Sequence, residues 1–159
     1  MVDMMAGTRQ YPRHVPPGAR PPRVIVAEDD ADVRRLVAVA LRPLGYEIIE
    51  ARTGAEVLDA IGGSLISRAT DDRPDVIISD IRMPGLTGME ILAGLRQLNW
   101  PTVFVLMTAF ADQETREEAQ RLGADAFFAK PFDVDDLMTA VINMAPSAFD
   151  RRGDSWKGR

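Results

Sequence analysis

Short apolar runs alternate along the chain with stretches in which apolar residues recur every three or four positions. A short apolar run bounded by turn residues is typical of a buried strand, and the longer period is typical of an amphipathic helix. Strands that alternate with helices indicate a parallel sheet covered by helices on both faces, with right-handed crossovers. The predicted strands are residues 23–27, 46–50, 76–79, 102–107 and 124–129.

The predicted helices begin at residues that can cap a helix. Asp30 or Asp32 can cap the first helix, and Thr53 and Thr87 each precede a glutamate by three residues, which is the capping-box spacing. The segment 62–72 opens with two glycines, so we expect a weakened helix followed by a surface extension. The first helix should bury one apolar face, formed by Val33, Leu36, Val37, Ala40, Leu41 and Leu44.

Both ends of the chain differ from this pattern. Residues 1–22 contain five prolines and no apolar period, which predicts a disordered or extended arm. Residues 147–159 form a polar, slightly basic tail, so the folded domain is expected at residues 23–146. No output domain follows, and we expect either a domain that works through protein contacts or a piece of a longer protein.

Composition excludes several classes of function. The absence of cysteine excludes disulfides, thiolate catalysis and cysteine-based zinc sites. A net charge of −5 argues against a direct nucleic-acid surface, and no apolar run approaches the ~18 residues of a membrane span. We therefore expect a cytoplasmic protein. His14 is the single histidine and lies in the arm, so a histidine-based metal site is not expected.

Chemically active residue types follow the predicted strands. Glu28 and Asp29 follow the first strand, and Asp80, Thr108 and Lys130 follow the third, fourth and fifth. Parallel strands bring their carboxyl ends to one edge of the sheet, where α/β proteins bind ligands. Each residue alone has an ordinary structural explanation, but together they match phosphoryl chemistry. Crowded carboxylates favour Mg²⁺ (or Mn²⁺), and a carboxylate beside such an ion can attack phosphorus.

These residues lie in motifs that resemble those of response-regulator receiver domains of bacterial two-component systems, of the chemotaxis and nitrogen-regulation types. The motifs are V-I-V-A-E-D-D, S-D-I-R-M-P-G-x-x-G, M-T-A and F-x-x-K-P-F. The resemblance implies a flavodoxin-like (βα)5 doubly wound parallel sheet with strand order 2-1-3-4-5. It also implies a phosphorelay switch, with only its own autophosphorylation and autodephosphorylation chemistry rather than enzymatic turnover.

The resemblance assigns roles to individual residues. Asp80 would accept a phosphoryl group from a histidine kinase or phosphotransfer protein. Asp29 and Asp80 would bind Mg²⁺ directly, Glu28 mostly through water, and Arg82 through its backbone carbonyl.

Further roles concern the phosphoryl oxygens and the switch. Thr108 and Lys130 would hold the oxygens, and Thr108 and Phe127 would then move. This movement would change the surface of the fourth helix, fifth strand and fifth helix, where a downstream protein binds. The family pattern also implies a cis Lys130–Pro131 bond and a homodimer that forms on phosphorylation.

Residues two positions after the acceptor and after the threonine tune attack by water in this family. They are Arg82 and Phe110 here, and a bulky Phe110 predicts a persistent phosphorylated state. Two alternatives stay open at this point. One is a degenerate receiver that only binds partners, and the other is an Mg²⁺-dependent aspartyl phosphatase. The latter needs an acid where this chain has Arg82, which cannot lose its proton.

Overall fold

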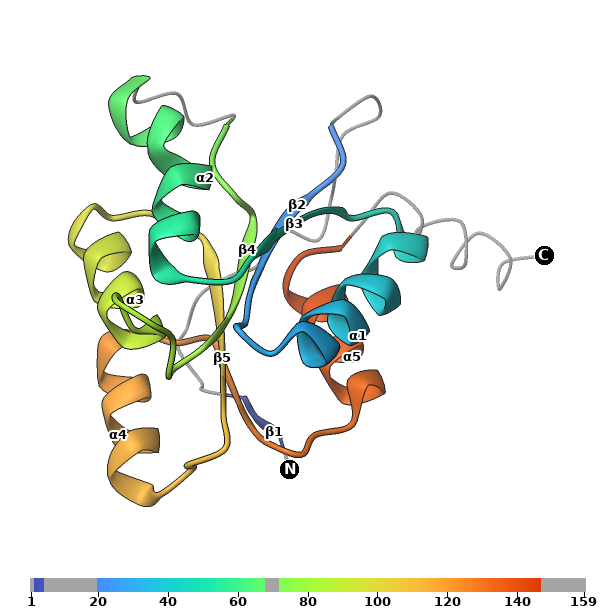
Figure 1. Ribbon diagram of the computed structural model, residues 1–159, viewed down its shortest axis with the longest axis vertical. Coiled ribbons are helices and arrows are strands. Elements are labelled where there is room, and N and C mark those ends of the chain that lie inside the picture. Colours follow the sequence, from blue (N-terminus) through green and yellow to red (C-terminus); the bar gives the residue numbers. More distant parts are fainter. Residues whose placement is uncertain (1, 5–19, 68–71, 147–159) are drawn as a thin grey trace.

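The protein folds as a sheet between two layers of helices in the computed structural model, which describes residues 2–4, 20–67 and 72–146 (Figure 1). The sheet has the order β1-β6-β5-β4-β2-β3, and all pairings among β2 to β6 are parallel. In chain order these five strands give 2-1-3-4-5, which confirms the predicted topology. They are β2 (Arg23–Ala27), β3 (Glu47–Ala51), β4 (Val76–Asp80), β5 (Val103–Thr108) and β6 (Ala126–Ala129).

Helices cover both faces of the sheet, and each face has its own apolar core. Val24 on β2 belongs to the core under α1 and α5, whereas its neighbour Ile25 belongs to the core under α2, α3 and α4. Because successive strand residues face opposite ways, burial on both faces explains the continuous apolar runs. The helices are α1 (Ala31–Leu41), α2 (Gly54–Ser67), α3 (Gly88–Gln97), α4 (Gln113–Leu122) and α5 (Val134–Met144), and a 3-10 turn, η1 (Arg42–Leu44), follows α1.

Capping side chains fix the helix starts next to the strand ends. Asp30 caps α1 and accepts hydrogen bonds from the N–H groups of Asp32 and Val33. Thr87 and Glu90 form the predicted capping box of α3. These bonds satisfy N–H groups that have no partner within the helix. Among the described helices, none has the length and apolar character needed to cross a membrane.

One local prediction was wrong. Leu36 is 50% exposed, because the buried face of α1 is centred on Val37, Ala38 and Leu41. The glycine pair at 62–63 does not interrupt α2, which continues to Ser67. Each glycine costs the helix about 1 kcal/mol relative to alanine, but burial of residues on either side of the pair offsets that preference.

The structure also contains a strand that the sequence pattern did not indicate. β1 (Val2–Met4) pairs antiparallel with β6 and extends the sheet at that edge. It lies within the arm predicted to be disordered or extended. The remainder of that arm, including His14, and the tail at 147–159 lie outside the described residues. The same holds for residues 68–71 of the predicted surface extension.

Candidate functional site

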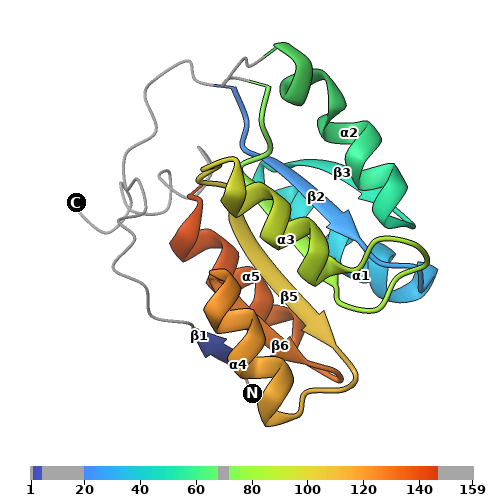
Figure 2. The same cartoon turned by 90° about the vertical axis from the view of Figure 1, so that its left-hand side faces the viewer.

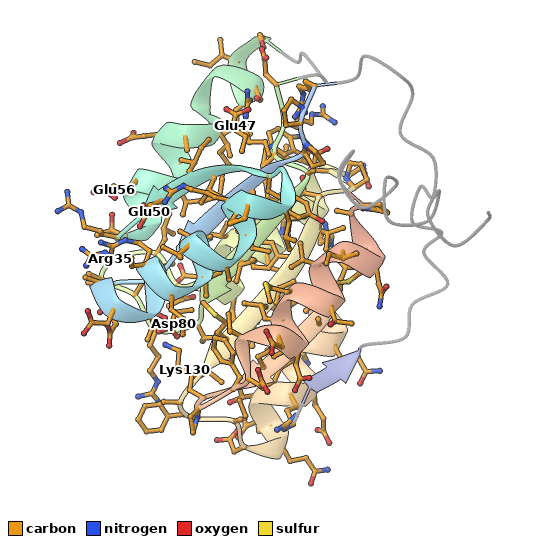
Figure 3. All side chains as sticks on the ribbon, turned by 90° about the vertical axis from the view of Figure 1, so that its right-hand side faces the viewer. Arg35, Glu47, Glu50, Glu56, Asp80 and Lys130 are labelled. Atoms are coloured by element: carbon orange, nitrogen blue, oxygen red, sulfur yellow. The ribbon has the colours of Figure 1, made fainter. Side chains whose placement is uncertain are left out.

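The carboxyl ends of four strands converge at one edge of the sheet. Glu28 directly follows β2, Asp80 ends β4, Thr108 ends β5, and Lys130 directly follows β6. Figure 3 shows the Asp80 and Lys130 side chains side by side at this edge. The convergence expected from a parallel sheet is therefore present.

Three carboxylates form the acidic part of the site. Glu28, Asp29 and Asp80 each offer an oxygen atom, and these atoms lie within 4.8 Å of one another. Glu28 is fully buried, Asp80 is 7% exposed, and Asp29 is exposed. Negative charges at this spacing repel one another, and burial increases the energetic cost. A set made only of carboxylate oxygens, with one member open to solvent, fits a hard divalent cation.

Lys130 neutralises part of this charge. Its Nζ donates to Asp80 Oδ2 at 2.8 Å and to Glu28 Oε2 at 2.5 Å. Burial lowers the pKa of Lys130, but its bonds to Asp80 and Glu28 outweigh that effect and raise the pKa overall. Burial raises the pKa of Glu28 to about 7, although the hydrogen bond from Lys130 acts in the opposite direction. Lys130 is thus the counter-ion of both buried acids.

Backbone groups hold the two buried acids in place. The N–H of Arg82 donates to Asp80 Oδ1 at 3.1 Å, and the N–H of Asp30 donates to Glu28 Oε1 at 3.1 Å. The start of α3 also packs tightly against β4, the strand that ends at Asp80. A Cβ atom at Gly88 would lie only 2.5 Å from the carbonyl oxygen of Asp80. The position of Asp80 therefore depends on the loop after β4 and on the first residue of α3.

Thr108 ends β5, which lies between β4 and β6, the strands that lead to Asp80 and Lys130. Asp80 is in register with Met107, the residue before Thr108, and the Lys130 N–H donates to the Thr108 carbonyl at 2.8 Å. The Thr108 side chain is almost fully buried, and its Oγ1 accepts a hydrogen bond from the Phe110 N–H at 3.1 Å. The peptide bond between Lys130 and Pro131 is cis, as the resemblance to receiver domains implied.

Comparison with known proteins agrees with this geometry. The family model of the response regulator receiver domain matches residues 24–142. The chain belongs to the receiver domain family.

The chain matches some relatives over nearly their whole length and others over only a part of it. Sporulation initiation phosphotransferase F of Bacillus subtilis is 30% identical over 78% of this chain and 94% of its own length. The regulatory protein AtoC of Escherichia coli is 36% identical over 75% of this chain, but only 24% of AtoC is covered. The receiver domain of the Francisella response regulator 1452 has a TM-score of 0.67 and 29% identity, covering 82% of this chain and 98% of that one.

The receiver's predicted switch aromatic is Phe127, which is fully buried in this structure. The guanidinium of Arg116 on α4 lies 5.0 Å from the centre of its ring. The predicted inward movement of Thr108 and Phe127 stays a prediction, as does a metal bond from the Arg82 carbonyl.

Sequence reasoning missed two arginines that reach this site. Arg34 on α1 donates to the Glu28 carbonyl at 2.9 Å, and Arg116 lies over Phe127. Each arginine follows the capping aspartate of its helix by four residues. Because helical side chains point back toward the N-terminus, this spacing directs a long side chain to the strand ends. That spacing is the signal that could have identified them.

Arg82 and Phe110 also contact each other, which their separation in the sequence did not indicate. The Arg82 guanidinium lies 3.8 Å from the centre of the Phe110 ring, and Phe110 is largely exposed. A guanidinium over an aromatic face is an attractive arrangement. The two residues that follow Asp80 and Thr108 by two positions thus form one contact.

Proposed function

We propose that this receiver domain is a phosphoacceptor switch in which Asp80 takes a phosphoryl group from a histidine kinase or phosphotransfer protein. The observation that carries the proposal is the bridge from Lys130 Nζ to Asp80 and Glu28, with Asp29 beside them. A carboxylate nucleophile, a fixed cation and a cluster of metal-binding oxygens are the parts that phosphoryl transfer needs.

Glu28, Asp29 and Asp80 would hold Mg²⁺ (or Mn²⁺), with the Arg82 carbonyl as a further ligand. The exposed position of Asp29 and the near burial of Glu28 and Asp80 support an ion that retains some of its water. When bound, the ion offsets negative charge on the phosphoryl oxygens.

In the transfer step, an Asp80 carboxylate oxygen forms a bond to phosphorus. The bond between phosphorus and the donor breaks, and its electron pair leaves with the donor. Lys130 is already within hydrogen-bonding distance of Asp80, so it can stay close to an oxygen of the transferred group. The Thr108 hydroxyl accepts one bond from Phe110 and keeps its own hydrogen free to donate. The chain supplies one reactive group rather than a turnover cycle, so we propose no enzymatic role beyond this chemistry.

The output would be a changed surface on α4, β6 and α5. Ala119 is the one buried residue in α4, all of whose residues the structure describes. A helix with so little buried surface can shift at small cost, and a switch needs a change of only a few kcal/mol. We propose that a downstream protein, or a second phosphorylated copy, binds this surface in the cytoplasm.

Intact-mass measurement after incubation with acetyl phosphate and Mg²⁺ tests the proposal. We expect one added phosphoryl group on the wild type. We expect none on Asp80→Asn and none in the wild type when a chelator removes the metal. Asp32→Asn, an exposed acid on α1, is the matched control and should be labelled normally. Labelling of Asp80→Asn, or labelling without metal, would refute the proposed chemistry. No label on folded wild-type protein would favour the receiver that only binds partners.

A further inference from the structure

The outer edge of β6 is covered by a segment from the other end of the chain. Val2, Asp3 and Met4 pair antiparallel with Phe128, Phe127 and Ala126. β1 also lies beside α5, and Figure 2 shows it at the end of the sheet next to β6. Among the described strands, β1 is the one that runs antiparallel to its neighbour.

The sequence of β6 lacks the features that normally protect an edge strand from pairing with another chain. Edge strands usually carry charges, prolines or bulges that prevent pairing with another chain. β6 is Ala-Phe-Phe-Ala and contains no charged residue and no proline. Among the described strands, only β1 pairs with the outer backbone groups of β6, so without β1 these groups would be available to another extended segment.

The direction of the backbone amides identifies which residues form this outer edge. The N–H of Asp125 donates to the Phe104 carbonyl of β5 at 2.8 Å. Backbone N–H groups alternate in direction along a strand. The N–H of Phe127 therefore also points toward β5, while the N–H groups of Ala126 and Phe128 point toward the outer edge. Their partners in register are Met4 and Val2. The edge therefore offers two outward-facing residues, and β1 supplies two residues opposite them.

We propose that the outer edge of β6 is a binding site for an extended antiparallel segment, and that residues 2–4 fill it as a displaceable cover. A three-residue strand makes few bonds and is weakly held. β1 is joined covalently to the domain that it pairs with, so its pairing with β6 is an intramolecular event.

The location of this edge indicates that β1 would regulate the binding of a partner. β6 lies between α4 and α5, on the surface that the proposed switch changes, and this part of the inference rests on the proposed function. A partner that adds a strand to β6 must first displace β1. The cover thus makes the N-terminal segment a competitor of such a partner.

Amide hydrogen exchange followed residue by residue tests the cover in the full-length chain without phosphoryl donor. The double variant Val2→Pro/Met4→Pro removes both amides that face β6. We expect the Ala126 and Phe128 amides to exchange about tenfold faster or more, since their protection would depend on β1. The Asp125 and Phe127 amides face β5 and should not change, and they serve as internal controls.

Three comparisons complete the test. Thr8→Pro, outside β1, should leave all these amides unchanged. A synthetic peptide of residues 1–8, added at millimolar concentration to the double variant, should slow exchange at Ala126 and Phe128 again. The same peptide with proline at positions 2 and 4 should not slow it.

Some results would overturn the inference. Equal exchange at Ala126 in the wild type and in a double variant that stays monomeric would show that β1 does not protect this edge. Equally faster exchange at Phe127 would show a general loss of stability. Failure of the peptide to restore protection would refute a binding site at the edge. A double variant that dimerises with Phe128 protected would support the site, with a second copy as occupant. These results do not depend on phosphorylation of Asp80.

Discussion

Replacing Gly88 with alanine tests how closely α3 is packed against β4, the strand that carries Asp80. Gly88 is the first residue of α3, directly after its capping residue Thr87. An added Cβ would lie 2.5 Å from the Asp80 carbonyl oxygen and 2.9 Å from Ser79 Oγ. The Asp80 oxygen is a backbone atom of a buried strand, so it cannot rotate away. Relief requires a shift of about 1 Å between α3 and the end of β4.

The expected magnitude follows from this overlap. Overpacking of a rigid interior typically costs about 1–3 kcal/mol, so Gly88→Ala should lower the free energy of unfolding by that amount. Gly94 lies in the same helix and has no heavy atom within 4 Å of an added Cβ. There, alanine should raise the free energy of unfolding by about 0.5–1 kcal/mol, through helix preference and reduced freedom of the unfolded chain. The same substitution should thus have opposite signs six residues apart.

Urea unfolding of wild type, Gly88→Ala and Gly94→Ala measures both effects, and phosphorylation from acetyl phosphate measures the consequence for the site. Because a misplacement of 1 Å can slow a reaction by about a hundredfold, Gly88→Ala should label at least tenfold more slowly than Gly94→Ala. A Gly88→Ala protein as stable as wild type would show that α3 and β4 tolerate the extra atom. Our account of how Asp80 is positioned would then be wrong.

Other predictions concern stability and the site. Arg96→Ala should lower the free energy of unfolding, measured in urea, by about 3–5 kcal/mol, because the buried Asp125 loses its ion pair with Arg96. Arg121→Ala removes the exposed ion pair with Glu118 and should change the free energy of unfolding by under ~0.5 kcal/mol. Lys130→Met should lower the unfolding temperature in chelator, because two buried carboxylates lose their counter-ion, and Mg²⁺ should recover part of the loss. No Mg²⁺ effect on that variant would contradict the proposed metal site. Phe110→Ala should shorten the lifetime of the phosphorylated state, measured by decay of the added mass; an unchanged lifetime would argue against shielding by this ring.

The sequence by itself determined which strands form the sheet, where the helices begin, and which site residues meet at one edge of the sheet. Strands buried on both faces must be continuously apolar, so β2 and β4 stand out in the pattern. Capping residues such as Asp30 and Thr87 act on N–H groups two or three residues away, which makes their signal local. Parallel strands share one carboxyl edge, so residues far apart in the chain could be placed together from their positions alone.

Only the tertiary structure decided which partners the long side chains contact and which weak strand pairings form. Arg96 donates to the carbonyls of Trp100, Thr102 and Gly123 and to the carboxylate of Asp125. Its sequence position gave no sign of this network, because a long flexible side chain takes its partners from whatever surrounds it.

The contacts of Phe127 with Arg116, the half-exposure of Leu36 and the pairing of β1 with β6 have a similar origin. A three-residue strand is too short to produce a readable period, and its pairing depends on an open edge that exists only after the other strands have assembled. Local patterns encode which elements form and where their ends meet, whereas contacts between distant surfaces arise only when those elements pack.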